Sequence, residues 1–136
     1  MDNEQKDKAP LIEMKRGTRN YQRDIKLDIE LKIIVGEYAV GSRFPSISAI
    51  AKIYGVGTST TQKALETLCS EGVIYNQKGI GYFVRPYMRE KLKAAHIKEL
   101  RERLESVAEY GLRLGVKKDD LIEFLVLAYD NASSSK

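Results

Sequence analysis

The stretch FPSISAIAKIYGVGTSTTQKALETLCSEGVIYNQKGIGYFV, residues 44–84, decides the fold of this chain. Ser46 follows Pro45, and serine is a preferred residue at the N-terminal cap of a helix. Apolar residues then recur at helical spacing, which predicts a short helix that buries Ile50, Ala51 and Tyr54. The triplet Gly55-Val56-Gly57 comes directly afterwards and indicates a tight turn.

A second helix is predicted after this turn. Thr58 or Ser59 is suited to cap its N-terminus, and Gly72 marks its end. Its inward side consists of apolar residues at helical spacing, namely Ala64, Leu65 and Leu68. Two short helices joined by a tight glycine-containing turn form a helix-turn-helix unit, whose second helix can enter a major groove of DNA.

The end of the stretch predicts a β-hairpin, because two short apolar runs, VIYN and YFV, flank the glycine-bearing turn QKGIG. Upstream, residues 25–33 alternate apolar and charged side chains, which taken alone is a strand signal. Isoleucines also recur there four residues apart, and Asp, Glu and Lys are poor strand formers that fit a helix surface. We favour a helix ending near Gly36, followed by a loop to Phe44, so that the whole predicts a winged helix.

The C-terminal part predicts two more helices. From about Arg89 the chain has strong helical character. An a/d series runs from Ile97 through Gly111 to Leu114, and Gly115 closes that helix. Asp119 and Asp120 suit the first turn of the next helix. The a/d series has two explanations, packing on the following helix of the same chain or on a second subunit; we expect a homodimer, because a two-helix tail would bury both apolar sides poorly alone. The candidate dimerisation residues are Ile97, Leu100, Leu104, Val107, Leu114, Leu121 and Leu125.

The expected fold class is mainly α with a small β-hairpin. We divide the chain into a flexible N-terminal arm (1–20), a winged helix-turn-helix domain (21–86), a helical dimerisation tail (87–132) and a frayed C-terminus (133–136).

Composition excludes several classes of protein. The chain has 136 residues, 43% of them hydrophobic and 31% charged, which fits a soluble, largely helical protein. No apolar run approaches the ~20 residues that span a bilayer, and no secretory leader opens the chain, so we expect a cytoplasmic protein without a membrane partner. One cysteine and one histidine leave no basis for a disulfide or a zinc cluster, and we expect no metal or cofactor. A net charge of +4 permits a nucleic-acid partner.

The two Gly-x-Gly triplets raise a second hypothesis, a nucleotide pocket. A dinucleotide fingerprint needs a strand before its glycines, a helix after them and a third glycine. Gly55-Val56-Gly57 instead follows a predicted helix and has Thr60 in the third position, while Gly79-Ile80-Gly81 lies between predicted strands. Neither triplet is therefore expected to bind a nucleotide.

Residues 25–84 resemble the GntR family of bacterial winged-helix transcription regulators, with the spacing of the family kept without a gap. The matching positions are Ile25, Ile29, Ile33, Gly36, Gly41, Phe44-Pro45-Ser46, Ile50-Ala51, Gly55-Val56, Thr60, Ala64-Leu65, Leu68, Glu71-Gly72, Gly79, Gly81, Phe83 and Val84. The tail, including the turn LRLGVKKDDLIEFL, is similar to that of the short-tailed YtrA-like branch. This resemblance implies a sequence-specific regulator that binds double-stranded DNA. The expected homodimer has twofold symmetry and therefore predicts a palindromic operator, and no segment for recruiting polymerase is visible, which favours a repressor. An unknown small-molecule effector is a further candidate partner.

The candidate DNA-binding residues combine helix starts, the exposed side of the second helix and the hairpin turn. They are Ser46, Ser48, Thr58, Ser59, Thr60, Gln62, Lys63, Lys78, Gly79 and Gly81. Family members often carry arginine where this chain has Ser48, Thr58 and Gln62. These departures leave an alternative open, a winged-helix interaction module that no longer recognises a DNA sequence. An enzyme is not expected, because no nucleophile motif or paired acid is present.

Overall fold

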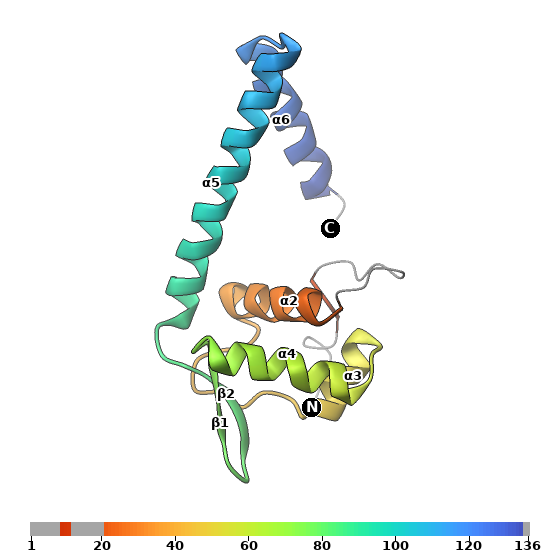
Figure 1. The fold of residues 1–136 in the computed structure, drawn as a ribbon, viewed down its shortest axis with the longest axis vertical. Helices are drawn as coiled ribbons and strands as arrows, with labels where there is room; N and C mark the ends of the chain where they lie inside the picture. Colours follow the sequence, from red (N-terminus) through yellow and green to blue (C-terminus); the bar gives the residue numbers. More distant parts are fainter. Residues whose placement is uncertain (1–8, 12–20, 135–136) are drawn as a thin grey trace. The chain divides into compact units, whose positions relative to one another are not determined.

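The computed structural model describes residues 9–11 and 21–134 of the chain (Figure 1). Most of the predicted arm and the last two residues lie outside these ranges. The described chain forms two compact units, one up to Ala94 and one from Ala95 onward, and we describe each separately. The first unit contains the helix-turn-helix and hairpin of the predicted winged helix, and the division falls inside a long helix.

The segment with the ambiguous period is a helix, α2 (Tyr21–Val35), as favoured. Its isoleucines line one buried side. The expectation that its charged residues lie on the surface is wrong, because Asp28 and Lys32 are fully buried and Glu30 is nearly so. Partners explain their burial: Tyr54 Oη donates to Asp28 Oδ2 at 2.6 Å, Lys26 Nζ pairs with Glu30 Oε2 at 2.9 Å, and Lys32 Nζ lies over the Tyr38 and Tyr54 rings.

The helix-turn-helix consists of α3 (Ile47–Tyr54) and α4 (Thr58–Ser70). Ser46 caps α3 as predicted, because its Oγ accepts from the Ala49 amide at 3.1 Å. Gly55 ends α3 in the left-handed region with φ 66°, where a side chain would be strained. The predicted Thr58 or Ser59 cap of α4 is wrong: Gly57 occupies the N-cap position without a side-chain bond, and the helix has already begun at Thr58.

The wing is an antiparallel hairpin of β1 (Ile74–Gln77) and β2 (Gly81–Val84), as predicted. Its register pairs Ile74 with Val84 and Gln77 with Gly81. The loop before α3 adds two isolated bridges to this hairpin, Val40 with Val84 and Arg43 with Phe83. Sequence periodicity did not indicate these bridges, because single paired residues have no alternating pattern.

One hydrophobic core holds the first unit together. The predicted inward side chains of α3 and α4 are buried. The core residues of this unit are Ile25, Ile29, Ile33, Tyr38, Phe44, Ile50, Tyr54, Ala64, Leu65, Leu68, Val73, Ile74, Val84, Met88 and Leu92.

The long helix α5 (Met88–Leu114) starts in the first unit and continues into the second, where α6 (Lys118–Ser134) follows. Arg89 Nε donates to the Ile34 carbonyl oxygen at 2.8 Å and attaches the start of α5 to the end of α2. In the second unit, Gly111 is buried against Leu121, whose Cδ2 lies 3.1 Å from where a glycine Cβ would stand. No residue of α6 is buried, and no helix among residues 9–11 and 21–134 is long and apolar enough to cross a membrane.

Candidate nucleic-acid interface

The N-terminal half of α4 separates side chains that face solvent from side chains that face the core. Thr58, Ser59, Gln62 and Lys63 are exposed, and Thr60 is half-buried. Thr61 is fully buried and donates its Oγ1 hydrogen to the Gly57 carbonyl oxygen at 3.1 Å. Four of the five predicted α4 candidates are therefore exposed, in the part of the helix that contacts base edges in helix-turn-helix proteins bound to DNA.

The side-chain amide of Gln62 already has a hydrogen-bond partner in the single chain. Its Nε2 donates to Glu66 Oε2 at 3.1 Å along the exposed side of α4. A bidentate contact with adenine needs both the oxygen and the nitrogen of the amide, so the side chain must exchange Glu66 for the base. The Glu66 carboxylate also adds a negative charge beside the surface that would approach phosphates.

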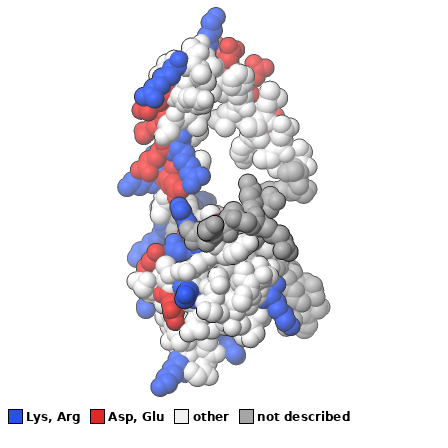
Figure 2. All heavy atoms as spheres, turned by 45° about the vertical axis from the view of Figure 1, so that its right-hand side comes forward, with Lys and Arg blue, Asp and Glu red and all other residues white. Residues whose placement is uncertain are grey.

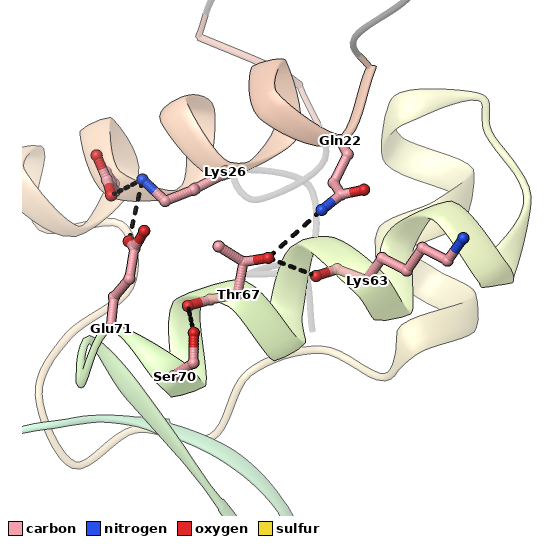
Figure 3. A network of polar contacts seen from close by, with 7 residues as sticks. Gln22, Lys26, Lys63, Thr67, Ser70 and Glu71 are labelled. Atoms are coloured by element: carbon pink, nitrogen blue, oxygen red, sulfur yellow. Dashed lines mark hydrogen bonds and ion pairs between the residues drawn. The ribbon is translucent and has the colours of Figure 1, made fainter.

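A polar network joins α4 to α2 (Figure 3). Gln22 Nε2 donates to Thr67 Oγ1 at 3.4 Å, and Thr67 Oγ1 in turn donates to the Lys63 carbonyl oxygen at 3.0 Å. Only the backbone of Lys63 takes part, and Figure 3 shows its side chain extending away from these contacts along α4. The network therefore fixes the helix while leaving the Lys63 ammonium free to reach a ligand.

Lys26 forms the second link between these helices. Its Nζ lies 2.9 Å from Glu30 Oε2 and 3.1 Å from Glu71 Oε1, at the C-cap of α4. Burial alone would lower the pKa of Lys26, but hydrogen bonds and charge interactions with the two carboxylates outweigh it and raise the pKa. The Lys26 ammonium therefore stays charged and neutralises Glu71. A charge count over residues 43–85 alone would treat Glu71 as an unpaired acidic residue that weakens the basic surface.

The end of α3 is held by a buried bond to Asp28. Tyr54 Oη donates to Asp28 Oδ2, and the backbone amide of Leu11 donates to Asp28 Oδ1 at 2.6 Å. Burial and the Asp28 carboxylate raise the pKa of Tyr54 far above its usual range. Sequence analysis missed Asp28, although its position between buried isoleucines at i−3 and i+1 was a signal that it leans toward the core.

The candidates at the start of α3 are both exposed. Ser46 already uses an oxygen lone pair in its cap, but its hydroxyl hydrogen remains available to a phosphate oxygen. Ser48 lies in the first turn of the helix. Both are therefore placed where a backbone phosphate could approach a helix N-terminus.

The wing presents Lys78 and Gly79 at its exposed turn. Gly79 has φ 80°, which the turn requires. Gly81 has a different reason to be glycine: its φ is 142°, and an added Cβ would lie 3.2 Å from Arg43 Nε. The structure thus brings Arg43 against the wing, a basic residue that sequence reasoning did not select.

Charge on the first unit is modest. Residues 43–85 contain five basic side chains, Arg43, Lys52, Lys63, Lys78 and Arg85, against Glu66 and Glu71. Figure 2 shows Lys and Arg of this unit as separate spots on the visible face rather than one continuous patch. Arg85 is partly engaged, because its guanidinium carbon lies 5.4 Å from the centroid of the Tyr75 ring. Such a surface favours contacts spread over more than one copy of the domain.

The candidate dimerisation residues are exposed in the single chain, with the exception of Leu121, which is half-buried. The exposed side chains are Ile97, Leu100, Leu104, Val107, Leu114 and Leu125, with fractions from 41% for Leu104 to 62% for Leu114.

Residues 21–84 match the family described as bacterial regulatory proteins, gntR family. The first unit contains the helix-turn-helix and wing that this match spans. This domain is therefore similar to those of the GntR family. The chain therefore carries a domain of the kind found in bacterial regulatory proteins, and the matched family is described as regulators rather than enzymes.

A relative supports the same family. Over 59 residues the chain is 37% identical to YisV of Bacillus subtilis, described as an uncharacterized HTH-type transcriptional regulator. The match covers 43% of this chain but 12% of YisV, so most of that longer protein has no counterpart here.

Solved structures extend the likeness beyond the matched domain. A GntR family transcriptional regulator from Listeria monocytogenes is similar over 82% of this chain and 96% of its own, with a TM-score of 0.68 and 24% identity, which shows the fold. A GntR-family protein from Bacteroides thetaiotaomicron covers 85% and 98% of the two chains, with a TM-score of 0.57 and 28% identity. The fold of mostly helices with a two-stranded sheet is therefore that of GntR regulators.

Proposed function

We propose that this chain is a sequence-specific transcription regulator that represses genes as a homodimer on a palindromic operator. The observation that carries the proposal is the exposed N-terminal half of α4 in a GntR-family domain. Thr58, Ser59 and Lys63 are exposed there, and polar contacts with α2 hold the helix in place. Lys78 at the wing tip supplies a second basic contact, suited to a minor groove.

The homodimer is supported by the apolar surface of the tail. Seven large apolar side chains of α5 and six of α6 are exposed in the single chain. At roughly 80–100 Å² each they present on the order of 1,000 Å², which exceeds the ~800 Å² per partner of a standard interface. A twofold dimer would place two copies of α4 on related half-sites, which is why we expect a palindrome.

The test begins with a randomised duplex library, from which the purified chain retains fragments at moderate salt. We expect an enriched palindrome. Charge reversal at Lys63→Glu and Lys78→Glu should then weaken binding to it and flatten the dependence on salt, because phosphate contacts release counterions. Lys117→Glu, at an exposed position in the turn between the tail helices, is the matched control and should change neither.

A second candidate function is a winged-helix module that binds another protein instead of DNA. Two observations favour this module. The amide of Gln62 is hydrogen-bonded to Glu66, and Ser48 and Thr58 are exposed at positions where family members often have arginine. Under this hypothesis no sequence is enriched, and the Lys63 and Lys78 reversals leave the weak retention of DNA unchanged.

A further inference from the structure

The side chain of Arg43 lies along the wing. Its backbone forms a bridge with Phe83 of β2, and Figure 1 shows the loop between α2 and α3 passing beside the hairpin. A Cβ added at Gly81 would lie 3.2, 3.6 and 3.8 Å from Nε, Cγ and Cδ of Arg43. Gly81 is closer to the wing turn than Phe83 is, so the Arg43 side chain extends from the bridge toward that turn.

The start of this side chain is held in place by the residue that follows it. The Phe44 amide donates to the Tyr82 carbonyl oxygen at 2.8 Å. Phe44 is also buried, with its ring centroid 4.5 Å from that of Tyr38. Because the backbone at Arg43 is fixed and its aliphatic part lies against Gly81, the side chain has less conformational entropy to lose when it binds a ligand.

The guanidinium at the other end of the side chain is not engaged. Arg43 is exposed, and within the described part of the chain no hydrogen bond or ion pair uses its guanidinium. Arg85 differs, because its guanidinium lies over the Tyr75 ring. A guanidinium has five N–H donors and no acceptor, so Arg43 is suited to a ligand that presents acceptors.

The sequence around Arg43 favours an anionic ligand. Residues 38–65 and 72–89 contain no aspartate or glutamate. Their basic residues are Arg43, Lys52, Lys63, Lys78, Arg85 and Arg89. The wing and the loop beside it therefore contribute only positive charge, which is complementary to DNA.

We infer that Arg43 determines part of the sequence specificity of the DNA complex, an inference that rests on the proposed function. Its guanidinium follows the wing into the minor groove and selects A·T base pairs that adjoin each half-site. In that groove an A·T pair shows only acceptors, whereas a G·C pair adds the N2 donor of guanine. A side chain with donors alone therefore matches the A·T edge. Runs of A·T pairs also narrow the minor groove and make its potential more negative, which attracts arginine.

The randomised duplex selection tests this role when it is repeated with variants of Arg43. The parent should enrich A·T pairs next to each half-site. Arg43→Ala should select the same half-sites without this enrichment, and it should bind an A·T-flanked operator about tenfold more weakly than the parent does. Arg43→Lys keeps the charge, so it should keep the salt dependence of binding but lose most of the A·T enrichment.

Lys52→Ala is the matched control, because it removes one exposed positive charge from α3 at a residue outside the candidate contacts. This variant should keep the A·T enrichment of the parent. Urea unfolding should give similar stability for the parent and for the Arg43 and Lys52 variants, because both side chains are exposed.

A double-mutant cycle tests the contact between Arg43 and Gly81. Alanine at Gly81 would be strained at φ 142°, and its Cβ would also displace the Arg43 side chain. Gly81→Ala should lower the affinity for the A·T-flanked operator in the parent and have little further effect in Arg43→Ala. An equal loss in both backgrounds would overturn the role of Gly81 in placing Arg43.

The same selections separate this inference from the proposed function. A parent that enriches no palindrome refutes the sequence-specific regulator and the role of Arg43 together. A parent that enriches a palindrome with random neighbouring base pairs refutes the role of Arg43 alone. So does full A·T enrichment by Arg43→Ala or by Arg43→Lys, because the guanidinium would then not be needed for it.

Discussion

The two units of this chain differ in how far a single copy buries its apolar side chains. In the winged-helix unit, Ile29, Leu65 and Leu68 have no exposed surface. In the tail, side chains of the same kind at Leu100, Leu104 and Leu125 are 41–55% exposed. Because burial of apolar surface is the main stabilising term in folding, the first unit has the core of an independent domain and the second does not.

This difference shows that an apolar helical period predicts that a side is buried, but not what buries it. Residues 60–68 and residues 97–107 both have helical apolar spacing. The former packs on α2 of its own chain, and the latter has no comparable neighbour within the described residues.

The same substitution placed in both units should give the largest contrast. Leu65→Ala should lower the free energy of unfolding by about 2–5 kcal/mol, because it leaves a cavity in a closed core. Leu104→Ala should cost within about 0.5 kcal/mol when the chain is dilute, because its side chain is already partly in water. Urea unfolding at several protein concentrations measures both.

Protein concentration provides a further test of the difference between Leu65→Ala and Leu104→Ala. If the tail is completed by a second copy, the cost of Leu104→Ala should grow as the protein becomes more concentrated, since the substitution then removes an interface contact. The cost of Leu65→Ala should not depend on concentration in this way. Equal costs for the two variants in dilute protein would contradict the proposed difference between the units.

Sequence periodicity and turn chemistry predicted the secondary structure of the first unit well. Ser46, Gly55 and the glycine-bearing wing turn each have a local stereochemical requirement that one residue type meets. The start of α4 was placed wrongly because threonine and serine follow Gly57 in a run, and each is an acceptable cap. The choice among them depends on the backbone angles of Gly57, which the sequence does not state.

The burial of the charged residues of α2 could not be predicted from the sequence, for a different reason. Asp28 and Lys32 look like surface residues of α2, because a charged side chain usually stays in water. The burial of Asp28 depends on Tyr54, 26 residues away in sequence, and that of Lys32 depends on a turn after α2 that brings the Tyr38 ring under its ammonium. The candidate DNA contacts stay predictions, and the structure adds Arg43 beside the wing to the residues worth testing with them.

Removing the buried hydroxyl should have the next largest effect. Tyr54→Phe deletes the donor to Asp28 inside the closed core, and we expect a loss of about 1–3 kcal/mol at neutral pH. Tyr87→Phe, whose side chain is 76% exposed, is the matched control and should change stability little. Thermal unfolding of the two variants checks this.

The pH dependence provides a second measure of the same bond. Because the folded pKa of Tyr54 is raised above its ordinary value of 10.0, the folded state holds a proton that the unfolded state loses. Stability from this group is fully present below pH 10.0 and falls as the pH rises further. Tyr54→Phe should remove that part of the decline, and Tyr87→Phe should keep it; identical slopes above pH 10.0 would refute the role of the bond.

The smallest expected effect separates Ser46 and Thr58, which lie at the starts of α3 and α4. Ser46→Ala removes the acceptor for the Ala49 amide and should cost about 1 kcal/mol. Thr58→Ala should cost less, because α4 has no side-chain cap to lose. Chemical denaturation with both variants measures this difference.

Affinity for the selected operator should distinguish the same two variants in the opposite order: Thr58→Ala should lose more affinity than Ser46→Ala, although it loses less stability. Thr58 is exposed on the recognition helix with no cap bond to maintain, so a loss of affinity in Thr58→Ala reports a contact with DNA rather than a damaged fold. Ser46 caps α3 and is also a candidate phosphate contact. A phosphate contact is assigned to it only if Ser46→Ala lowers the free energy of DNA binding by more than it lowers the free energy of unfolding. If Thr58→Ala destabilises the domain as much as Ser46→Ala, then Thr58 supports the start of α4 after all, and its exposure is no argument for a contact with DNA.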